Sequence, residues 1–273
     1  MSFFQHRDLY PYIDYYLTHQ NHLDMDHLLN EKCLYLHESP KEVVKKLSTA
    51  KVLMINPDKF DEWSDILLFI HQKQPLPVKL ILIADSDISL DNDYLDALFA
   101  FFSETEFWIQ NWLGYHERCT LLPLGTFGSI PQISSQKEKV LGISYSKLYI
   151  GCKEREDFFA FLKNKPEMLA NCFPKSSFDE YCTRLSKCIF HLCPMGEGYD
   201  TFRFWESLAV KTIPIVKDHV FYECLARQYP EIPMVRLTEW ETVDEYIKEA
   251  QVFPELPFLY TDYWVSKIKQ FLE

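Results

Sequence analysis

The segment Lys187 to Val216 constrains the fold of this chain more than any other stretch. It opens with an apolar run, Cys188 to Cys193, that predicts a buried strand. A loop with two of the chain's 7 glycines follows, and the run Thr201 to Val210 then has the spacing of an amphipathic helix. A second apolar strand is predicted from Ile213 to Val216. Because such strand–helix–strand crossovers join parallel strands, this order predicts an α/β fold with a parallel sheet.

The glycine loop and the helix after it form an arrangement suited to phosphate. Gly196 and Gly198 stand where the backbone must bend sharply or let a ligand approach closely. Asp200 or Thr201 is expected to cap the helix. The unpaired N–H groups of the first helical turn and the positive end of the helix dipole both favour an anion at this place.

Two charged residues in this helix extend the interpretation. Arg203 offers a planar guanidinium group for phosphate oxygens, and Glu206 can accept hydrogen bonds from ribose hydroxyls. Together they indicate a nucleoside diphosphate. The same spacing also fits an ordinary Arg203–Glu206 pair on the surface of an amphipathic helix, and a Gly-x-Gly pattern alone does not decide between the two.

The run from Cys193 to Leu208, with Ile213 to Val216 after it, closely resembles the nucleotide-sugar-binding motif of exostosin-like glycosyltransferases. The pattern in that family is roughly C/S-P-R-G-x-G-x-D-x-x-R-x-W-E-A-L, followed by G-C-I-P-I/V. The match covers about thirty residues. It depends on four residues at the right offsets, which are Asp200, Arg203, Trp205 and Glu206.

The chain departs from the family pattern at three places. Met195 stands where the family usually has arginine, and Glu197 stands where it often has asparagine. Lys211-Thr212 replaces the usual Gly-Cys, a change that concerns packing more than chemistry. Because Met195 removes a cation beside the expected diphosphate, a protein that binds nucleotide sugar without turning it over remains an alternative.

Shorter similarities lie elsewhere in the chain. Ile83 to Asp87 is similar to the family's H-N-S-D turn, and Gln110-Asn111 followed by Leu122 to Gly125 is similar to its Q-N and I-P-L-G. Leu237 to Trp240 resembles an acidic-Trp turn near the family's C-terminus.

The resemblance implies a GT-B-like architecture, in which two Rossmann-like α/β domains face one another across a cleft. Residues 1–135 would form the acceptor-side domain and residues 136–273 the donor-binding domain, with the final helix packing back on the first. We place the linker from Thr126 to Gln136, where Gly, Ser and Pro gather.

The resemblance also implies an inverting transfer of sugar from a UDP-sugar to a glycan hydroxyl, without an obligatory metal or other cofactor. Arg203 would stabilise the leaving diphosphate and Glu206 would position the ribose. The residues expected to bind the donor are Gly196, Glu197, Gly198, Asp200, Thr201, Arg203 and Glu206.

Candidate acceptor-side residues follow two predicted strands of the first half. Asp85 and Asp87 come directly after the apolar run Val78 to Ala84, and Asn111 follows the next strand. An Asp-x-Asp pair can bind a metal–nucleotide complex, but short acidic residues are also ordinary turn formers, and we predict no metal site. Asp87, Asp85 and His116 are candidates for the base that deprotonates the acceptor, and His116 also fits a solvated loop histidine.

Composition limits the classes of partner. A formal charge of −12 argues against nucleic acid or an anionic membrane as the main partner, because both reward a basic surface. The 8 cysteines are scattered without a C-x-x-C pair, which indicates reduced core thiols. No run reaches the roughly 18 to 20 apolar residues of a membrane span, and without a basic and then apolar segment at the start we expect no signal peptide. We therefore expect a cytoplasmic protein.

The remaining expected elements alternate between strands and helices. The helices are His6 to His19, Pro40 to Ser48, Pro57 to Gln72, one from about Asp91, Glu154 to Leu162, Ser177 to Ser186, Val220 to Arg227, Thr242 to Glu249 and the tail Phe258 to Phe271. The strands are Cys33 to Leu36, Lys51 to Ile55, Val78 to Ala84, Phe107 to Gln110, Cys119 to Leu122, Leu148 to Gly151 and Met234 to Leu237.

Overall fold

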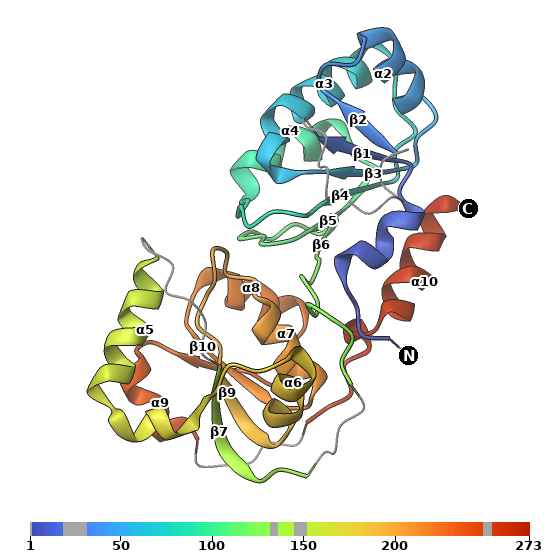
Figure 1. Cartoon of the computed structure of the whole chain (residues 1–273). Coiled ribbons are helices and arrows are strands. Elements are labelled where there is room, and N and C mark those ends of the chain that lie inside the picture. Colours follow the sequence, from blue (N-terminus) through green and yellow to red (C-terminus); the bar gives the residue numbers. More distant parts are fainter. Residues whose placement is uncertain (1, 19–31, 132–135, 145–151, 248–252) are drawn as a thin grey trace. The chain divides into compact units, whose positions relative to one another are not determined.

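A computed structural model of the chain describes residues 2–18, 32–131, 136–144, 152–247 and 253–273 (Figure 1). It divides the chain into two compact units. The N-terminal unit comprises His6–Leu122 with Asp262–Glu273, and the C-terminal unit comprises Met1–Gln5 with Pro123–Thr261. Each unit is built around one parallel β-sheet, so the predicted α/β class is confirmed.

Within the described residues, the N-terminal unit has a six-stranded sheet in the order β2-β1-β3-β4-β5-β6. Every neighbouring pair in it is parallel. The strand order reverses between β1 and β3, which is the place where open α/β sheets commonly bind ligands. The strands are β1 (Tyr15–Thr18), β2 (Cys33–Tyr35), β3 (Val52–Ile55), β4 (Leu80–Ile83), β5 (Glu106–Ile109) and β6 (Cys119–Leu121).

Helices cover both faces of this sheet. One face packs against α2 (Pro40–Leu47), α3 (Phe60–Lys73), which follows the short η2 (Pro57–Lys59), and α4 (Asn92–Phe101). Ser39 and Asp91 cap α2 and α4 through side-chain oxygens, as sequences of this kind predict. The other face packs against η1 (His6–Tyr12) and α10 (Thr261–Leu272), where Trp264 lies edge-on to Trp108.

The C-terminal unit has, in its described part, a five-stranded parallel sheet in the order β11-β10-β9-β7-β8. Its strand order reverses between β7 and β9. Leu141 of β7 is in register with Phe190 of β9, so Ser144 and Cys193 follow at the same carboxyl edge. The strands are β7 (Lys139–Ser144), β8 (Cys172–Phe173), β9 (Cys188–Leu192), β10 (Ile213–Lys217) and β11 (Val235–Leu237).

Two sets of helices enclose this second sheet (Figure 1). Helix α5 (Lys153–Asn164), η3 (Pro166–Asn171), η4 (Trp240–Thr242) and α9 (Val243–Tyr246) share one core with the sheet. Helix α6 (Phe178–Ser186) packs on β9 and α7 (Phe202–Ala209) packs on β10. Helix α8 (Val220–Gln228) meets α7 through Tyr222 and Phe204, and the short η5 (Pro257–Leu259) leads into α10.

One predicted helix differs from this structure, one strand was missed, and one predicted strand is not tested. The predicted helix His6 to His19 is wrong over its second part, because only His6–Tyr12 is helical and Tyr15–Thr18 is strand β1. Pairing with β2 and β3 on both sides stabilises β1 and outweighs its local pattern. Strand β7 was not predicted, since its first two residues are exposed. The strand predicted from Leu148 to Gly151 lies outside the described residues.

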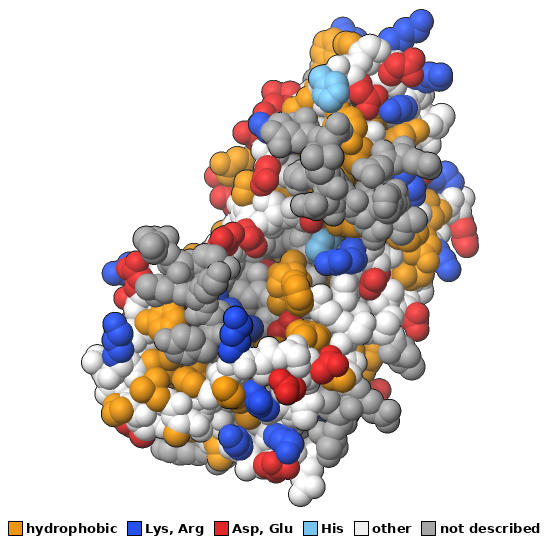
Figure 2. Space-filling model, viewed as in Figure 1, with side chains coloured by type: hydrophobic (Ala, Val, Ile, Leu, Met, Phe, Trp, Pro, Cys, Tyr) orange, Lys and Arg blue, Asp and Glu red, His pale blue; other side chains and the backbone are white. Residues whose placement is uncertain are grey.

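The division between the units falls between Leu122 and Pro123, ahead of the predicted linker from Thr126 to Gln136. Residues 132–135 of that linker lie outside the described part of the chain. In the described residues no helix is both long and apolar enough to cross a bilayer. Lys and Arg side chains are interspersed with Asp and Glu on the face drawn in Figure 2.

Candidate functional site

The start of α7 resolves which residue caps that helix. Thr201 has extended backbone geometry, and its Oγ1 accepts a hydrogen bond from the N–H of Phe204 at 3.4 Å. Asp200 is 2% exposed and has another function: its Oδ2 accepts from the N–H of Leu124 at 2.8 Å, and its Oδ1 accepts from the indole N–H of Trp205. Thr201 is therefore the N-cap, and Asp200 braces the loop from within.

The glycine loop does not depend on a backbone shape that only glycine adopts. Among the described glycines, positive φ occurs at Gly125 and not at Gly196 or Gly198. The N–H of Gly196 donates to the carbonyl of Gly198 at 3.0 Å, and a Cβ added at Gly196 would lie no closer than 3.7 Å to its neighbours. The chain does bend sharply, from Glu197 to Asp200, so the expected bend is confirmed although neither glycine has positive φ. Close approach of a ligand stays a prediction.

Arg203 and Glu206 both line a cavity of about 780 Å³, which we call the α7 cavity. Glu206 is 4% exposed, and its Oε1 accepts from the N–H of Phe127 at 3.4 Å. Burial raises the pKa of Glu206, while the neighbouring Tyr181 hydroxyl, the Phe127 amide and the Arg203 charge lower it. Glu206 is therefore not part of an ordinary surface ion pair.

Arg203 lies at the second position of α7. One guanidinium nitrogen, Nη1, donates to the carbonyl of Pro194 at 3.2 Å, which orients the side chain along the loop. The ion pairs between described residues do not include Arg203. Its positive charge is therefore available to an anion bound in the cavity.

Aromatic rings form one wall of the α7 cavity. Phe127 is 62% exposed and lies edge-on to Phe202 at 5.6 Å between ring centroids. Phe173, Phe178 and Tyr181 continue the lining. The other lining residues are small or polar and are Ser144, Pro174, Lys175 and Ser176. A planar, partly polar ligand fits such a mixed lining.

A buried histidine lies between Ser144, which lines this cavity, and Ser207 of α7. His191 of β9 is fully buried, and burial together with the Arg203 charge lowers its pKa to about 3. The Ser207 hydroxyl donates to the carbonyl of Arg203 at 2.6 Å, so Ser207 accepts from His191 Nδ1 at 2.7 Å. His191 Nε2 then accepts from Ser144 at 3.0 Å. Sequence reasoning missed this network, whose only signal was one histidine within an apolar strand.

In the N-terminal unit, Asp85 is the centre of a polar network. It follows β4 with a φ of 78°. Its carboxylate accepts from the Tyr16 hydroxyl at 2.9 Å and lies 3.4 Å from Nε2 of His6. Its N–H donates to the side chain of Gln110 at 2.9 Å, and Asn56 donates to Tyr16 at 2.9 Å. Sequence reasoning singled out Asp85 but missed His6, Tyr16 and Asn56, which come from distant parts of the chain.

Asn111 lies at the neighbouring strand end. It is 1% exposed, has a φ of 50°, and its side chain donates to the carbonyl of Ser86 at 3.3 Å. A non-glycine residue held at positive φ costs on the order of 1 kcal/mol or more, and such residues gather at functional sites. Asp85 and Asn111 are therefore held in place at one edge of the sheet. Asp87, two residues beyond Asp85, is exposed.

His116 lies at the opposite edge of the same sheet. It precedes β6, which runs parallel to β5, so it is at the amino end of these strands, whereas Asp85 follows the carboxyl end of β4. Its ring stacks on Phe99 at 4.1 Å, and its Nδ1 accepts from the N–H of Arg118 at 3.2 Å. The structure does not bring His116 together with Asp85 or Asp87, and His116 is not part of the proposed site.

The described residues provide neither a cluster of metal ligands nor a reactive thiol at these sites. In the part of the chain that the structure describes, no three His, Cys, Asp or Glu side chains are grouped so that they could hold a metal ion. The 8 cysteines are free thiols. Cys193, beside His191, is fully buried, and burial raises its pKa to about 12. It is therefore not a reactive thiolate.

The α7 cavity thus combines a guanidinium group without an ion-pair partner in the described chain, a buried carboxylate one turn away and an aromatic wall. The known protein-family models do not match this chain, and no match is found among curated proteins. The motif from Cys193 to Leu208 and the geometry around it are therefore the features of this chain that bear on its function.

Proposed function

We propose that the chain is a glycosyltransferase that binds a UDP-sugar in the α7 cavity and transfers the sugar to a hydroxyl group of a glycan. The observation that carries this proposal is the placement of Arg203 and Glu206, both of which line one cavity of about 780 Å³. A nucleoside diphosphate needs a cation for its phosphates and an acceptor for its ribose hydroxyls, and these residues offer both.

In this binding mode, the diphosphate lies against Arg203 and the first amide groups of α7. Helix N-termini and arginine both favour phosphate oxygens. The ribose hydroxyls donate to Glu206, whose position is set by the Phe127 amide. The uracil base of the nucleotide packs against the aromatic wall that includes Phe127 and Phe202.

The proposed reaction is an inverting displacement. An acceptor oxygen attacks the anomeric carbon, the bond from that carbon to the diphosphate breaks, and UDP leaves with the electron pair. Arg203 and the amide groups of α7 stabilise the charge that develops on the phosphate, and one such donor is worth about 3 kcal/mol. This step is the part of the reaction for which the residues of α7 are suited.

We propose a GT-B-like architecture, in which one domain binds the donor and the other binds the acceptor. Two parallel sheets, each with one reversal of strand order, support it. The acceptor is assigned to the N-terminal unit, and Asp85 is the residue that takes its proton. Hydrogen bonding to Tyr16 and the nearby His6 hold its carboxylate in place, whereas Asp87 is exposed.

The test is UDP binding by three proteins. We expect UDP at millimolar concentration to raise the melting temperature of the wild type. Glu206→Ala should weaken UDP binding at least tenfold, because hydrogen bonds to a charged group are worth about 1.5 to 3 kcal/mol. Asp85→Ala is the matched control and should leave the dissociation constant within about twofold. Equal effects of the two substitutions, or no response of the wild type to UDP, would contradict the donor site.

A second candidate function is favoured by Met195. At the position of the family arginine this side chain supplies no cation, so the chain could bind nucleotide sugar without turning it over. Incubation with a panel of UDP-sugars separates the two functions. Release of UDP together with sugar transfer or donor hydrolysis supports the transferase, and UDP binding without turnover supports a nucleotide-sugar-binding protein.

A further inference from the structure

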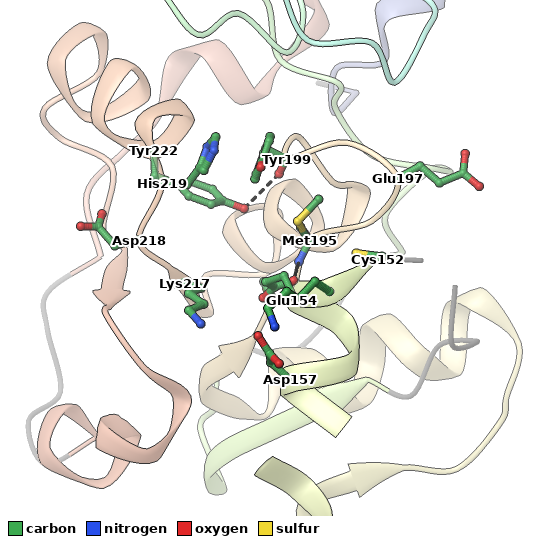
Figure 3. Close-up of a pocket in the computed structure, with 12 residues that line it drawn as sticks. Cys152, Glu154, Asp157, Met195, Glu197, Tyr199, Lys217, Asp218, His219 and Tyr222 are labelled. Atoms are coloured by element: carbon green, nitrogen blue, oxygen red, sulfur yellow. Dashed lines mark hydrogen bonds between the residues drawn. The ribbon is translucent and has the colours of Figure 1, made fainter. Parts of the chain in front are cut away.

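The C-terminal unit contains a second cavity, of about 500 Å³ (Figure 3). Its lining includes Met195 and Glu197, so Glu197, which was expected to bind the donor, lines this cavity and not the α7 cavity. The second cavity is lined by the start of α5, the loop between β9 and α7, and the end of β10 with the start of α8. We call it the α5 cavity. It shares no lining residue with the α7 cavity.

Glu154 lines the α5 cavity, and one of its carboxyl oxygens has no hydrogen-bond partner among the described residues. Its Oε2 accepts from the N–H of Met195 at 2.9 Å, and the neighbouring Arg155 donates to the carbonyl of Met195 at 2.6 Å. Its Oε1 is buried and has no hydrogen-bond partner among the described residues. Burial raises the pKa of Glu154 to about 7. A buried polar atom without a partner is costly, and a hydroxyl group of a ligand would satisfy it.

Polar groups of both signs gather beside Glu154. Figure 3 shows Lys217, from the end of β10, and Asp157, from the next turn of α5, on the same side of the cavity as Glu154. Lys217 provides donors and Asp157 provides acceptors. This set of groups can pair with several hydroxyl groups at once.

A fixed aromatic pair forms another part of the lining. Tyr199 stacks on His219 with ring centroids 3.4 Å apart and an angle of 11° between the rings. The Tyr222 hydroxyl donates to the carbonyl of Tyr199 at 3.0 Å, and His219 Nδ1 accepts from the N–H of Phe221 at 3.2 Å. Both ends of the pair are therefore held, and Nε2 of the neutral His219 carries a hydrogen that can be donated.

The charge of the lining narrows the class of ligand. Acidic side chains outnumber basic ones even when Glu154, whose pKa is raised to about 7, is left out: Asp157, Glu197 and Asp218 lie in the lining with Lys153 and Lys217. An anionic ligand would be repelled by this excess of negative charge. A neutral ligand that carries many hydroxyl groups and has an apolar face meets both the polar cluster and the aromatic pair.

We propose that the α5 cavity binds a neutral carbohydrate unit, whose hydroxyl groups pair with Glu154 and Lys217 and whose apolar face packs on the Tyr199–His219 pair. The inference deepens the proposed function and takes its class of ligand from it. The unit belongs either to the acceptor or to the donor sugar, and both present the same chemistry.

Lys217→Ala and Glu239→Ala are the test variants. Lys217 also forms an ion pair with Glu239 at 3.1 Å, and the Glu239 side chain is 64% exposed and lies outside the lining. Glu239→Ala therefore breaks the same ion pair without changing the cavity. Glu154→Gln is the second cavity variant, because its amide oxygen still accepts from Met195 while its amide nitrogen replaces Oε1.

Binding is measured by calorimetry in two series. One uses neutral mono- and disaccharides without nucleotide, and the other compares UDP-sugars with UDP. If the cavity binds a unit of the acceptor, we expect the saccharides of the first series to bind. If it binds the donor sugar, we expect UDP-sugars to bind more tightly than UDP in the second series. In whichever series binding occurs, Lys217→Ala should weaken it about tenfold, Glu154→Gln should weaken it measurably, and Glu239→Ala should leave it unchanged.

The inference is overturned if no saccharide binds and UDP-sugars bind no tighter than UDP, or if Lys217→Ala and Glu239→Ala have equal effects. Plain UDP is the separate readout for the proposed function. If UDP binds but the sugar series show nothing, the inference fails and the proposed function stands. If saccharide binding depends on Lys217 but UDP does not bind, the inference stands and the proposed function fails.

Discussion

Glu154 shows how a single residue acquires an unusual property from its surroundings. It lies in the first turn of α5, where an acidic side chain is ordinary. Burial nevertheless raises its pKa from 4.5 to about 7, and the hydrogen bond from Met195 and the charge of Arg155 oppose this shift only in part. The folded chain therefore holds a proton on Glu154 at pH values where the unfolded chain has released it.

This shift predicts a dependence of stability on pH. Because the pKa of Glu154 is higher in the folded state, its contribution is fully present below pH 4.5 and is lost as the pH rises to about 7. Glu154→Gln cannot titrate, so its melting temperature should fall less between pH 5 and pH 8 than that of the wild type. Thermal unfolding at both pH values measures the difference. Glu156→Gln, at an exposed position of α5, should behave like the wild type, and a variant curve parallel to the wild-type curve would refute the assignment.

Two residues of the motif illustrate what spacing can and cannot show. The offsets of Arg203 and Glu206 predicted that they lie one turn apart, and helix α7 confirms this. The same offsets could not show that Glu206 is buried, because Phe127 and Tyr181 cover it from distant parts of the chain. Tertiary contacts also separated the functions of Asp200 and Thr201, which the sequence left as alternative caps.

At the scale of one element, the end of α7 is held by a residue that does not suit its backbone. Lys211 has a φ of 57°. Its N–H donates to the carbonyl of Leu208 at 3.0 Å, and the N–H of Thr212 donates to that of Ser207 at 2.8 Å. This is the Schellman pattern, in which glycine is the usual residue at the left-handed position. Lysine at this position therefore carries backbone strain.

Lys211→Gly should stabilise the chain by about 0.5 to 1 kcal/mol, because glycine adopts positive φ without a steric cost. Lys211 is exposed, so little side-chain contact is lost. The free energy of unfolding in urea measures the gain. Lys211→Ala is the control, since alanine keeps the Cβ atom that causes the strain. An equal gain from both variants would show that the lysine side chain, and not the backbone, is responsible.

At the scale of the whole molecule, the N-terminal unit is completed by the last residues of the chain. Asp262–Glu273 belong to it although the preceding residues belong to the C-terminal unit. Trp264 and Ile268 of α10 are fully buried, and Trp264 lies 5.2 Å from Trp108 of β5 between ring centroids. The final helix therefore covers one face of the first sheet.

Trp264→Ala should destabilise the chain by about 3 to 5 kcal/mol, the range for removal of a large buried aromatic side chain. Gln270→Ala is the control in the same helix. It is exposed and should change stability by no more than about 0.5 kcal/mol. Denaturant unfolding followed by tryptophan fluorescence and by circular dichroism measures both. Similar small effects would mean that α10 adds little to the first core.

Local signals in the sequence by themselves determined much of this protein. Ser39 and Asp91 at helix starts, the apolar run that becomes β4, and the strand, loop and helix from Cys188 onward all depend on residues within a few positions of one another. They were enough for the α/β class and for the choice of Arg203 and Glu206. Only the tertiary structure decided the short strands β1 and β7, the burial of Glu206, the network around Asp85 and the unused oxygen of Glu154. These features depend on contacts with residues far away in the chain, and the residues next to each position in the sequence do not predict such contacts.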